Sequence, residues 1–215
     1  MPRKRKRRSR PLAIPRHTWV GAPVLSAARQ LNVRCFAALV EAVKHHPPSA
    51  GTPALQVLSE FASRIDARVC ERVGSCPVLL VNLNFDVSEF WDRVTAGMHL
   101  SPPQTLLTQT AASPLLREVL MQAWSLAHSL PRAASLFFGM SPAVREAIGR
   151  LTGEEIDRVA QEHAVYLRPR WEDRRTFWSR LLKAATGTSD EALIDVQLHC
   201  LSLLGGELVP LRRDG

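Results

Sequence analysis

The chain has 215 residues, of which 46% are hydrophobic and 22% are charged, and this balance excludes a fibrous or wholly disordered protein. No apolar run approaches the ~20 residues that a membrane span needs, and no apolar signal segment follows the basic amino terminus, so we expect a cytoplasmic protein. Four cysteines without a CxxC pair argue against a zinc ribbon or a disulfide framework and favour buried, reduced thiols.

The amino terminus carries a concentrated positive charge. The net charge of the chain is +8, and seven of its 28 basic residues lie among the first ten residues. These seven residues are Arg3, Lys4, Arg5, Lys6, Arg7, Arg8 and Arg10. Like charges repel one another and bury no apolar surface, so residues 1–16 are expected to form a disordered arm. Polyanions are its natural partners because neutralised phosphates release condensed counterions, and a solubilising tail is the alternative.

Residues 24–98 are predicted to form a helical amino-terminal region. Apolar residues recur at helical spacing from Val24 to His46, with Asn32 as a candidate break, and again from Ala54 to Val73. A short loop rich in proline and glycine separates the two segments. The two helices are therefore expected to pack antiparallel.

The middle of the chain contains the candidate strand and the candidate linker. Residues 77–85 (PVLLVNLNF) have strand or extended character, and Asp86 with Glu89 predicts a capping box before a further helix. Residues 99–113 contain two prolines and five serine or threonine residues. This composition predicts a linker between the amino-terminal region and a carboxyl-terminal domain over residues 114–208.

The carboxyl-terminal domain opens with a long predicted helix whose first position is Pro114. An apolar link over residues 133–140 ends at a glycine, and a short helix follows over residues 143–150. Thr152 with Glu155 predicts a capping box that opens the next helix. Two short helices that meet at a tight turn are typical of a helix-turn-helix, although helical hairpins in ordinary cores have the same pattern.

The end of the chain is predicted to be extended and then helical. Residues 165–171 (VYLRPRW) read as extended, since a proline disfavours helix in the residue before it. Two helices follow, over Asp173–Ala185 and Asp190–Leu204, and Leu201 is expected on the inner face of the second. Gly205–Gly206 is predicted to stop this last helix.

The stretch from Leu115 to Leu208 resembles the FlhD family of flagellar transcriptional activators. The resemblance covers nearly half of the chain, and it is carried by the order and spacing of several segments. After an apolar first helix these are AASLFFGM at 133–140, REAIGRLT at 145–152, EEIDRVAQEH at 154–163 and VYLRPRW at 165–171, with two helices at the end. The resemblance implies an all-α fold, an intertwined dimer, and assembly with a second subunit, FlhC, at promoter DNA.

Particular residues acquire expected roles from this resemblance. Arg168 and Arg170 lie in the extended segment, with Arg170 matching a family arginine, so both join the basic arm as candidate DNA-binding residues. Leu167 stands where the family has a cysteine, so no disulfide is transferred. The dimer or partner interface is assigned to Leu116, Leu120, Phe137, Phe138 and Trp171.

No arrangement of residues indicates catalysis. His163 and His199 are lone histidines in predicted helices, which favours solvated or core positions. Glu154 and Glu155 lie in a first helical turn, where carboxylates satisfy free amide groups. The GxGxxG, P-loop, GxSxG and HExxH patterns do not occur in the sequence. We therefore expect a protein that is not an enzyme and that has no cofactor or metal.

The sequence as a whole predicts an all-α subunit of a bacterial transcriptional activator that dimerises and acts with an FlhC-like partner at promoter DNA, in the cytoplasm at the nucleoid. RNA polymerase is a further candidate partner. One alternative is a protein-interaction or anti-activator subunit that does not itself bind DNA specifically. A second is an RNA-binding protein that uses the same arm.

Overall fold

The computed structural model describes residues 21–45, 51–98, 100 and 107–208, and within these ranges the protein is all-α, as predicted. The α-helices are α1 (Ala22–His45), α2 (Pro53–Phe61), α3 (Ala67–Gly74), α4 (Ser88–Thr95), α5 (Gln109–Ser129), α6 (Pro131–Phe138), α7 (Pro142–Arg150), α8 (Gly153–Glu162), α9 (Arg175–Thr186) and α10 (Asp190–Leu208). The short elements are the 3-10 turns η1 (Ala62–Arg64) and η2 (Ala164–Tyr166) and the strands β1 (Val81–Asn82) and β2 (Arg168–Pro169).

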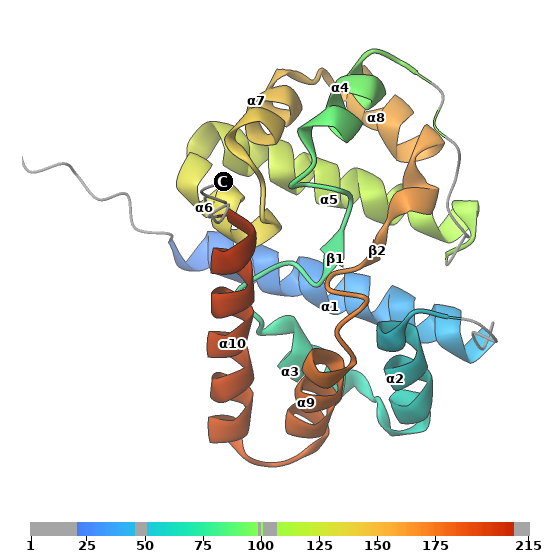
Figure 1. Cartoon of the computed structure of the whole chain (residues 1–215), viewed down its shortest axis with the longest axis vertical. Helices are drawn as coiled ribbons and strands as arrows, with labels where there is room; N and C mark the ends of the chain where they lie inside the picture. Colours follow the sequence, from blue (N-terminus) through green and yellow to red (C-terminus); the bar gives the residue numbers. More distant parts are fainter. Residues whose placement is uncertain (1–20, 46–50, 99, 101–106, 209–215) are drawn as a thin grey trace, which may run out of the picture.

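The long helix α1 runs through the middle of the molecule (Figure 1). On one side of it lie α2, α3 and α9, with α9 in contact with both of the others, and on the other side α5 packs against α6, α7 and α8. Helix α10 packs on α9 and runs along the edge of the molecule towards α6 (Figure 1). The buried hydrophobic side chains form one continuous core across these elements.

The contacts between helices do not follow the predicted division at residues 99–113. The amino-terminal helices α2 and α3 pack against the carboxyl-terminal helix α9, while α4 packs against α7. The predicted linker is also too long, because α5 begins at Gln109 and contains Pro114 in its interior rather than at its first position. Pro114 lies in the second turn, where its missing N–H removes a single bond close to the start of the helix.

Asn32 does not break α1, contrary to the candidate break in the sequence. Its side chain is fully buried, and its Nδ2 donates to the carbonyl oxygens of Cys76 and Val78 at 3.2 and 2.8 Å. Its Oδ1 accepts from the backbone N–H of Leu80 at 2.9 Å. Asn32 therefore holds the extended segment before β1 against α1, because these backbone groups would otherwise be buried without partners.

The single helix predicted over Ala54–Val73 is divided into α2 and α3. The break falls at Ile65 and Asp66, and the Asp66 carboxylate caps α3 by accepting from the N–H of Val69 at 2.8 Å. Gly74 ends α3 where this helix crosses α1, and a Cβ atom at that position would collide with Val33. The break therefore lets a second short helix approach α1 closely.

The capping box predicted for Asp86 and Glu89 is absent. The residue before α4 is Val87, which makes no side-chain cap hydrogen bond. The turn before α4 is instead held by Asn82, whose Oδ1 accepts from the N–H of Phe85 at 3.1 Å.

The apolar link predicted over residues 133–140 is mostly the helix α6. Its C-cap is Gly139, whose φ of +69° lies in the left-handed region that favours glycine. Ser141 caps α7 by accepting from the N–H of Val144. The predicted capping box of Thr152 and Glu155 is confirmed at α8.

The two segments predicted to be extended pair with each other over two residues each, but the second segment begins in the 3-10 turn η2 and not in extended chain. β1 and β2 are antiparallel, with Val81 opposite Pro169 and Asn82 opposite Arg168. The pairing continues just outside the strands, where the N–H of Arg170 donates to the carbonyl of Leu80 at 2.8 Å. This short ladder joins residues that are almost ninety positions apart in the sequence, at the centre of the molecule.

Candidate functional site

The seven basic residues of the predicted arm, from Arg3 to Arg10, lie outside the described residues. The other two candidate DNA-binding residues, Arg168 and Arg170, lie at β2. The contacts of their side chains therefore show whether each guanidinium is accessible to a phosphate.

Arg170 is not available to bind a phosphate, so the structure corrects its predicted role. Its side chain is 1% exposed, and its Nη1 donates to the carbonyl of Phe138 at 3.0 Å and, more weakly, to that of Leu79 at 3.4 Å. Its Nη2 donates to the Glu207 carboxylate at 3.2 Å. Burial lowers the pKa of the Arg170 guanidinium, and the negative charge of Glu207 opposes this effect.

Arg168 is only partly accessible. Its Nε donates to the Glu172 carboxylate at 2.9 Å, and the Arg168 side chain in this ion pair is 23% exposed. An arginine that already neutralises a carboxylate offers little charge to a nucleic-acid backbone. Neither arginine of the extended segment therefore forms an open basic surface.

The predicted interface residues are buried by the chain itself. Leu116, Leu120 and Phe138 are completely buried, and Phe137 and Trp171 are 7% and 8% exposed. Phe137 and Phe138 contact each other edge to face, with ring centroids 4.9 Å apart. These five side chains belong to the core of one copy, so the prediction that they lie on an interface surface is wrong for this structure.

The helix pair α7 and α8 meets at a tight turn as predicted, but its solvent side does not suit DNA. Four carboxylates lie on the exposed or half-exposed positions of α8, against one half-exposed arginine, Arg158; the carboxylates are Glu154, Glu155, Asp157 and Glu162. Asp157 also binds Arg117 of α5 at 2.6 Å. A helix that enters the major groove meets the phosphates on both sides, and carboxylates in that position are repelled. The pair is better described as a helical hairpin.

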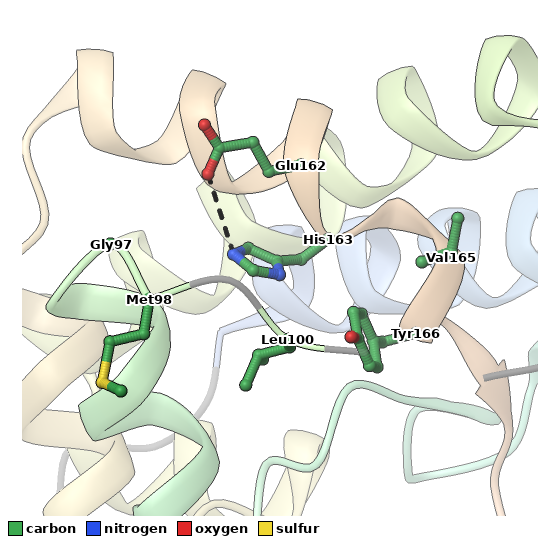
Figure 2. A pocket seen from close by; sticks show the side chains of 7 residues that line it. All are labelled: Gly97, Met98, Leu100, Glu162, His163, Val165 and Tyr166. Atoms are coloured by element: carbon green, nitrogen blue, oxygen red, sulfur yellow. Dashed lines mark ion pairs between the residues drawn. The ribbon is translucent and has the colours of Figure 1, made fainter. Parts of the chain in front are cut away.

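A cavity of about 470 Å³ lies beside the end of α8. Figure 2 shows His163 at its centre, between Glu162 on one side and Leu100 with Tyr166 on the other. The His163 Nε2 is 3.9 Å from the Glu162 carboxylate, and the ring of Phe90 contacts those of His163 and Tyr166. His163 is 5% exposed, which confirms the core interpretation of this histidine.

This cavity combines apolar walls with one imidazole and one carboxylate. Its size is within the range of small-molecule pockets. Within the described residues, no group of three or more His, Cys, Asp or Glu side chains could hold a metal ion. None of the described helices combines the length and hydropathy that crossing a membrane requires.

An exposed apolar row on α10 was missed by the sequence analysis. Ile194, Leu198 and Leu201 are 51%, 58% and 44% exposed, so the placement of Leu201 on the inner face was wrong. The inner face consists of Leu193, Val196, Cys200 and Leu204. The helical spacing in the sequence could have revealed the exposed row. The four inner residues form one complete stripe along the helix, and Ile194, Leu198 and Leu201 lie on a different stripe.

Helix α10 also continues beyond Gly205–Gly206, contrary to the predicted stop, and ends at Leu208. Glu207 in its last turn accepts hydrogen bonds from Arg170 Nη2 and Trp171 Nε1. These tertiary bonds offset the weak helix preference of two glycines. The exposed row is thereby extended by one more turn.

No family model, curated protein or solved structure matches the chain. Its role is therefore inferred from its own residues, and the resemblance to FlhD remains a prediction.

Proposed function

We propose that the chain is a non-catalytic subunit of a transcriptional regulator that dimerises and acts with an FlhC-like partner at promoter DNA, in the cytoplasm at the nucleoid. The observation that carries the proposal is the uneven distribution of charge. Seven of the 28 basic residues lie among the first ten residues, and the remaining 21 nearly balance the 20 acidic residues of the chain. A short, strongly basic segment supplies salt-sensitive affinity for phosphates that does not depend on base sequence.

The positions of the two arginines support a division of labour between the arm and the partner subunit. Arg170 is internal and Arg168 is paired with Glu172, so in this proposal the phosphate contacts come from the arm. Exposed Arg180 and Lys183 on α9 provide additional positive charge. Base reading is assigned to the partner subunit because the accessible side of α8 is acidic. The order of helices that resembles FlhD supports a partner of the FlhC type, and RNA polymerase is a further contact of the assembly.

The test begins with tagged protein recovered from its native host. The recovered assembly is sized and then used in a gel shift with promoter DNA at several salt concentrations. We expect an FlhC-like subunit and a sequence-specific shift. Deleting residues 1–16 should weaken the shift and reduce the slope of log affinity against log salt by about 6, if all seven basic residues contact phosphates.

The matched control keeps the length of the arm and replaces its seven basic residues with glutamine. It should behave like the deletion, because charge is the property that the proposal invokes. If both variants bind promoter DNA as tightly as the intact protein, the arm has no such role and the chain is a protein-interaction or anti-activator subunit. Stronger competition by structured RNA than by duplex DNA would identify an RNA-binding protein instead.

A further inference from the structure

Helix α10 has two apolar sides, and only one of them is covered by the other described parts of the chain. Ile194, Leu198 and Leu201 are about half exposed, and Gly205 continues their row one turn further. Spacings of four, three and four residues place all four positions on one face of a helix. This row, which we call the α10 face, lies on a helix at the edge of the molecule (Figure 1).

The α10 face is accessible along its length. A Cβ atom added to Gly205 would meet no atom within 4 Å, and the same holds for Gly206. The three large side chains of the row are among the exposed large hydrophobic residues of the described part of the chain. A contiguous apolar row of this kind is typical of a surface that another protein covers.

The spacing of the row makes it complementary to itself. The sequence of spacings is the same when it is read from either end, so two copies of α10 can pair antiparallel about a two-fold axis that passes between Leu198 and Leu201. Leu198 of one copy then lies opposite Leu201 of the other. Ile194 lies opposite Gly205, whose missing side chain leaves room for a large one. Helices meet closely where large and small residues alternate in this way.

Charge selects the antiparallel orientation over the parallel one. The amino-terminal half of α10 carries Asp190, Glu191 and Asp195, of which Asp190 pairs with Arg72 at 2.6 Å. The carboxylate of the last turn, Glu207, is already paired with Arg170, so it adds little repulsion to an antiparallel pair. A parallel pair would bring the acidic halves together, whereas an antiparallel pair keeps them at opposite ends.

We propose that the α10 face is the surface on which two copies of this chain pair, antiparallel and in the register that sets Ile194 against Gly205. This inference specifies the surface through which the dimer of the proposed function forms, and it rests on that proposal for its biological meaning. It also accounts for Gly205 in a helix that continues past it, since a larger residue at 205 opposite Ile194 would hold the two helices apart.

The first experiment measures self-association by analytical ultracentrifugation over a range of protein concentrations. Leu198→Lys places a charge at the centre of the α10 face, and Val87→Lys is the matched control because Val87 is 42% exposed before α4. We expect the intact chain and Val87→Lys to have the same dimer dissociation constant. The dissociation constant of Leu198→Lys should be higher by about tenfold or more. Thermal melts monitored by circular dichroism establish that both variants are folded.

The second experiment tests register and orientation by disulfide crosslinking under mild oxidation. Two variants with different tags, Ile194→Cys and Gly205→Cys, are mixed in a Cys70→Ser background, since Cys70 is the half-buried thiol and the other three cysteines are buried. The antiparallel register predicts crosslinks between the two variants. Crosslinks within Ile194→Cys alone would indicate a parallel pair and overturn the proposal.

Other outcomes separate this proposal from the proposed function. An intact chain that stays monomeric, or a Leu198→Lys dimer as tight as that of the intact chain, overturns the α10 pairing whatever the DNA result. If Leu198→Lys loses an FlhC-like partner while the intact chain never forms homodimers, the face belongs to that partner and the proposal is wrong. Normal pairing without promoter binding rejects the proposed function and retains the pairing.

Discussion

Arg170 Nη2 donates to the Glu207 carboxylate at 3.2 Å, and this ion pair ties the segment after β2 to the last turn of α10. The same carboxylate accepts from Trp171 Nε1. Trp171 has a φ of +51°, which is rare for an aromatic residue and is held here by these contacts. The pair therefore fixes the orientation of the helix that carries the α10 face.

Removing the charge of Glu207 should destabilise the protein. Glu207→Gln leaves the Arg170 guanidinium, which is 1% exposed, without a neutralising partner. Because Glu207 is itself partly exposed, we expect a loss of about 3 kcal/mol in the free energy of unfolding, at the lower end for a broken buried pair. Urea denaturation at pH 7 measures it. Asp195→Asn is the control, because it removes a charge from an exposed position of α10 and should change the free energy of unfolding little. Equal effects of the two variants would show that the pair of Arg170 and Glu207 is not important for stability.

Gly139→Ala should also destabilise the protein, for a steric reason. Gly139 has a φ of +69°, and an added Cβ would collide with the Arg170 guanidinium. The left-handed backbone alone costs an alanine about 1–2 kcal/mol, and displacement of Arg170 adds to this. The comparison is Gly153→Ala, where a Cβ meets no atom within 4 Å. If thermal melts show the same stability for both variants, Arg170 is free to move and its role as a fixed link is rejected.

Asn32→Ala should be more damaging than its small change in volume suggests. The substitution leaves the N–H of Leu80 and the carbonyls of Cys76 and Val78 without the Asn32 side chain. An unsatisfied buried polar group costs about 1–3 kcal/mol, so a total loss of about 3 kcal/mol or more is expected. Urea denaturation measures the loss, and hydrogen exchange should show faster exchange of the Leu80 amide. Unchanged exchange at Leu80 would contradict the account of Asn32 as the group that holds this segment.

The positions of most helices could be predicted because apolar periodicity and capping are local. The capping box of Thr152 and Glu155 needs only four consecutive residues, and it forms as predicted. The end of α10 could not be predicted in this way, because the bonds of Glu207 reach residues 36 and 37 positions away in the sequence. Hydrogen bonds to residues far away in the sequence therefore determine whether α10 continues through Gly205 and Gly206.

The candidate site was predicted less well, and for the same reason. Arg170 is basic and lies in an extended segment, which is all that its neighbours in the sequence reveal. Its burial depends on carbonyl groups of Leu79 and Phe138, from two other segments. Whether an apolar residue such as Leu116 faces the core of its own chain or a second copy likewise depends on which helices pack over it.

The capping box of α8 should give the protein a measurable dependence on pH. Hydrogen bonds from the Thr152 backbone and side chain lower the pKa of Glu155 below its ordinary value of 4.5. The folded state therefore prefers the ionised carboxylate, and the stability that it contributes is present above this value and is lost as the pH falls below it.

Glu155→Gln tests this dependence, since the amide keeps a hydrogen-bond acceptor without the charge. The melting temperature of the variant should lie below that of the intact chain at pH 7, and the difference should shrink as the pH is lowered to about 3. Glu154→Gln is the control, because Glu154 shares the first turn of α8 and lies outside the capping box. A difference for Glu155→Gln that stays constant with pH would show that the charge of Glu155 is not stabilising.

The four cysteines should differ sharply in reactivity. Burial raises the pKa of the Cys35 thiol, and a hydrogen bond with Cys200 together with burial raises that of Cys76. Cys70 is half-buried, and burial raises its pKa too, but reagents can reach it. Because only the thiolate attacks a disulfide reagent, a buried thiol of high pKa reacts slowly.

Titration with Ellman's reagent at pH 8 should therefore show one thiol reacting in the folded chain and four in denaturant. Cys70→Ser should abolish the reaction in the folded chain and leave three thiols in denaturant. If any thiol still reacts rapidly in folded Cys70→Ser, the core opens around Cys35, Cys76 or Cys200. Since Cys200 lies on the inner face of α10, a reactive Cys200 would mean that this helix separates from α9, and the α10 face would then have no fixed support on which two copies could pair.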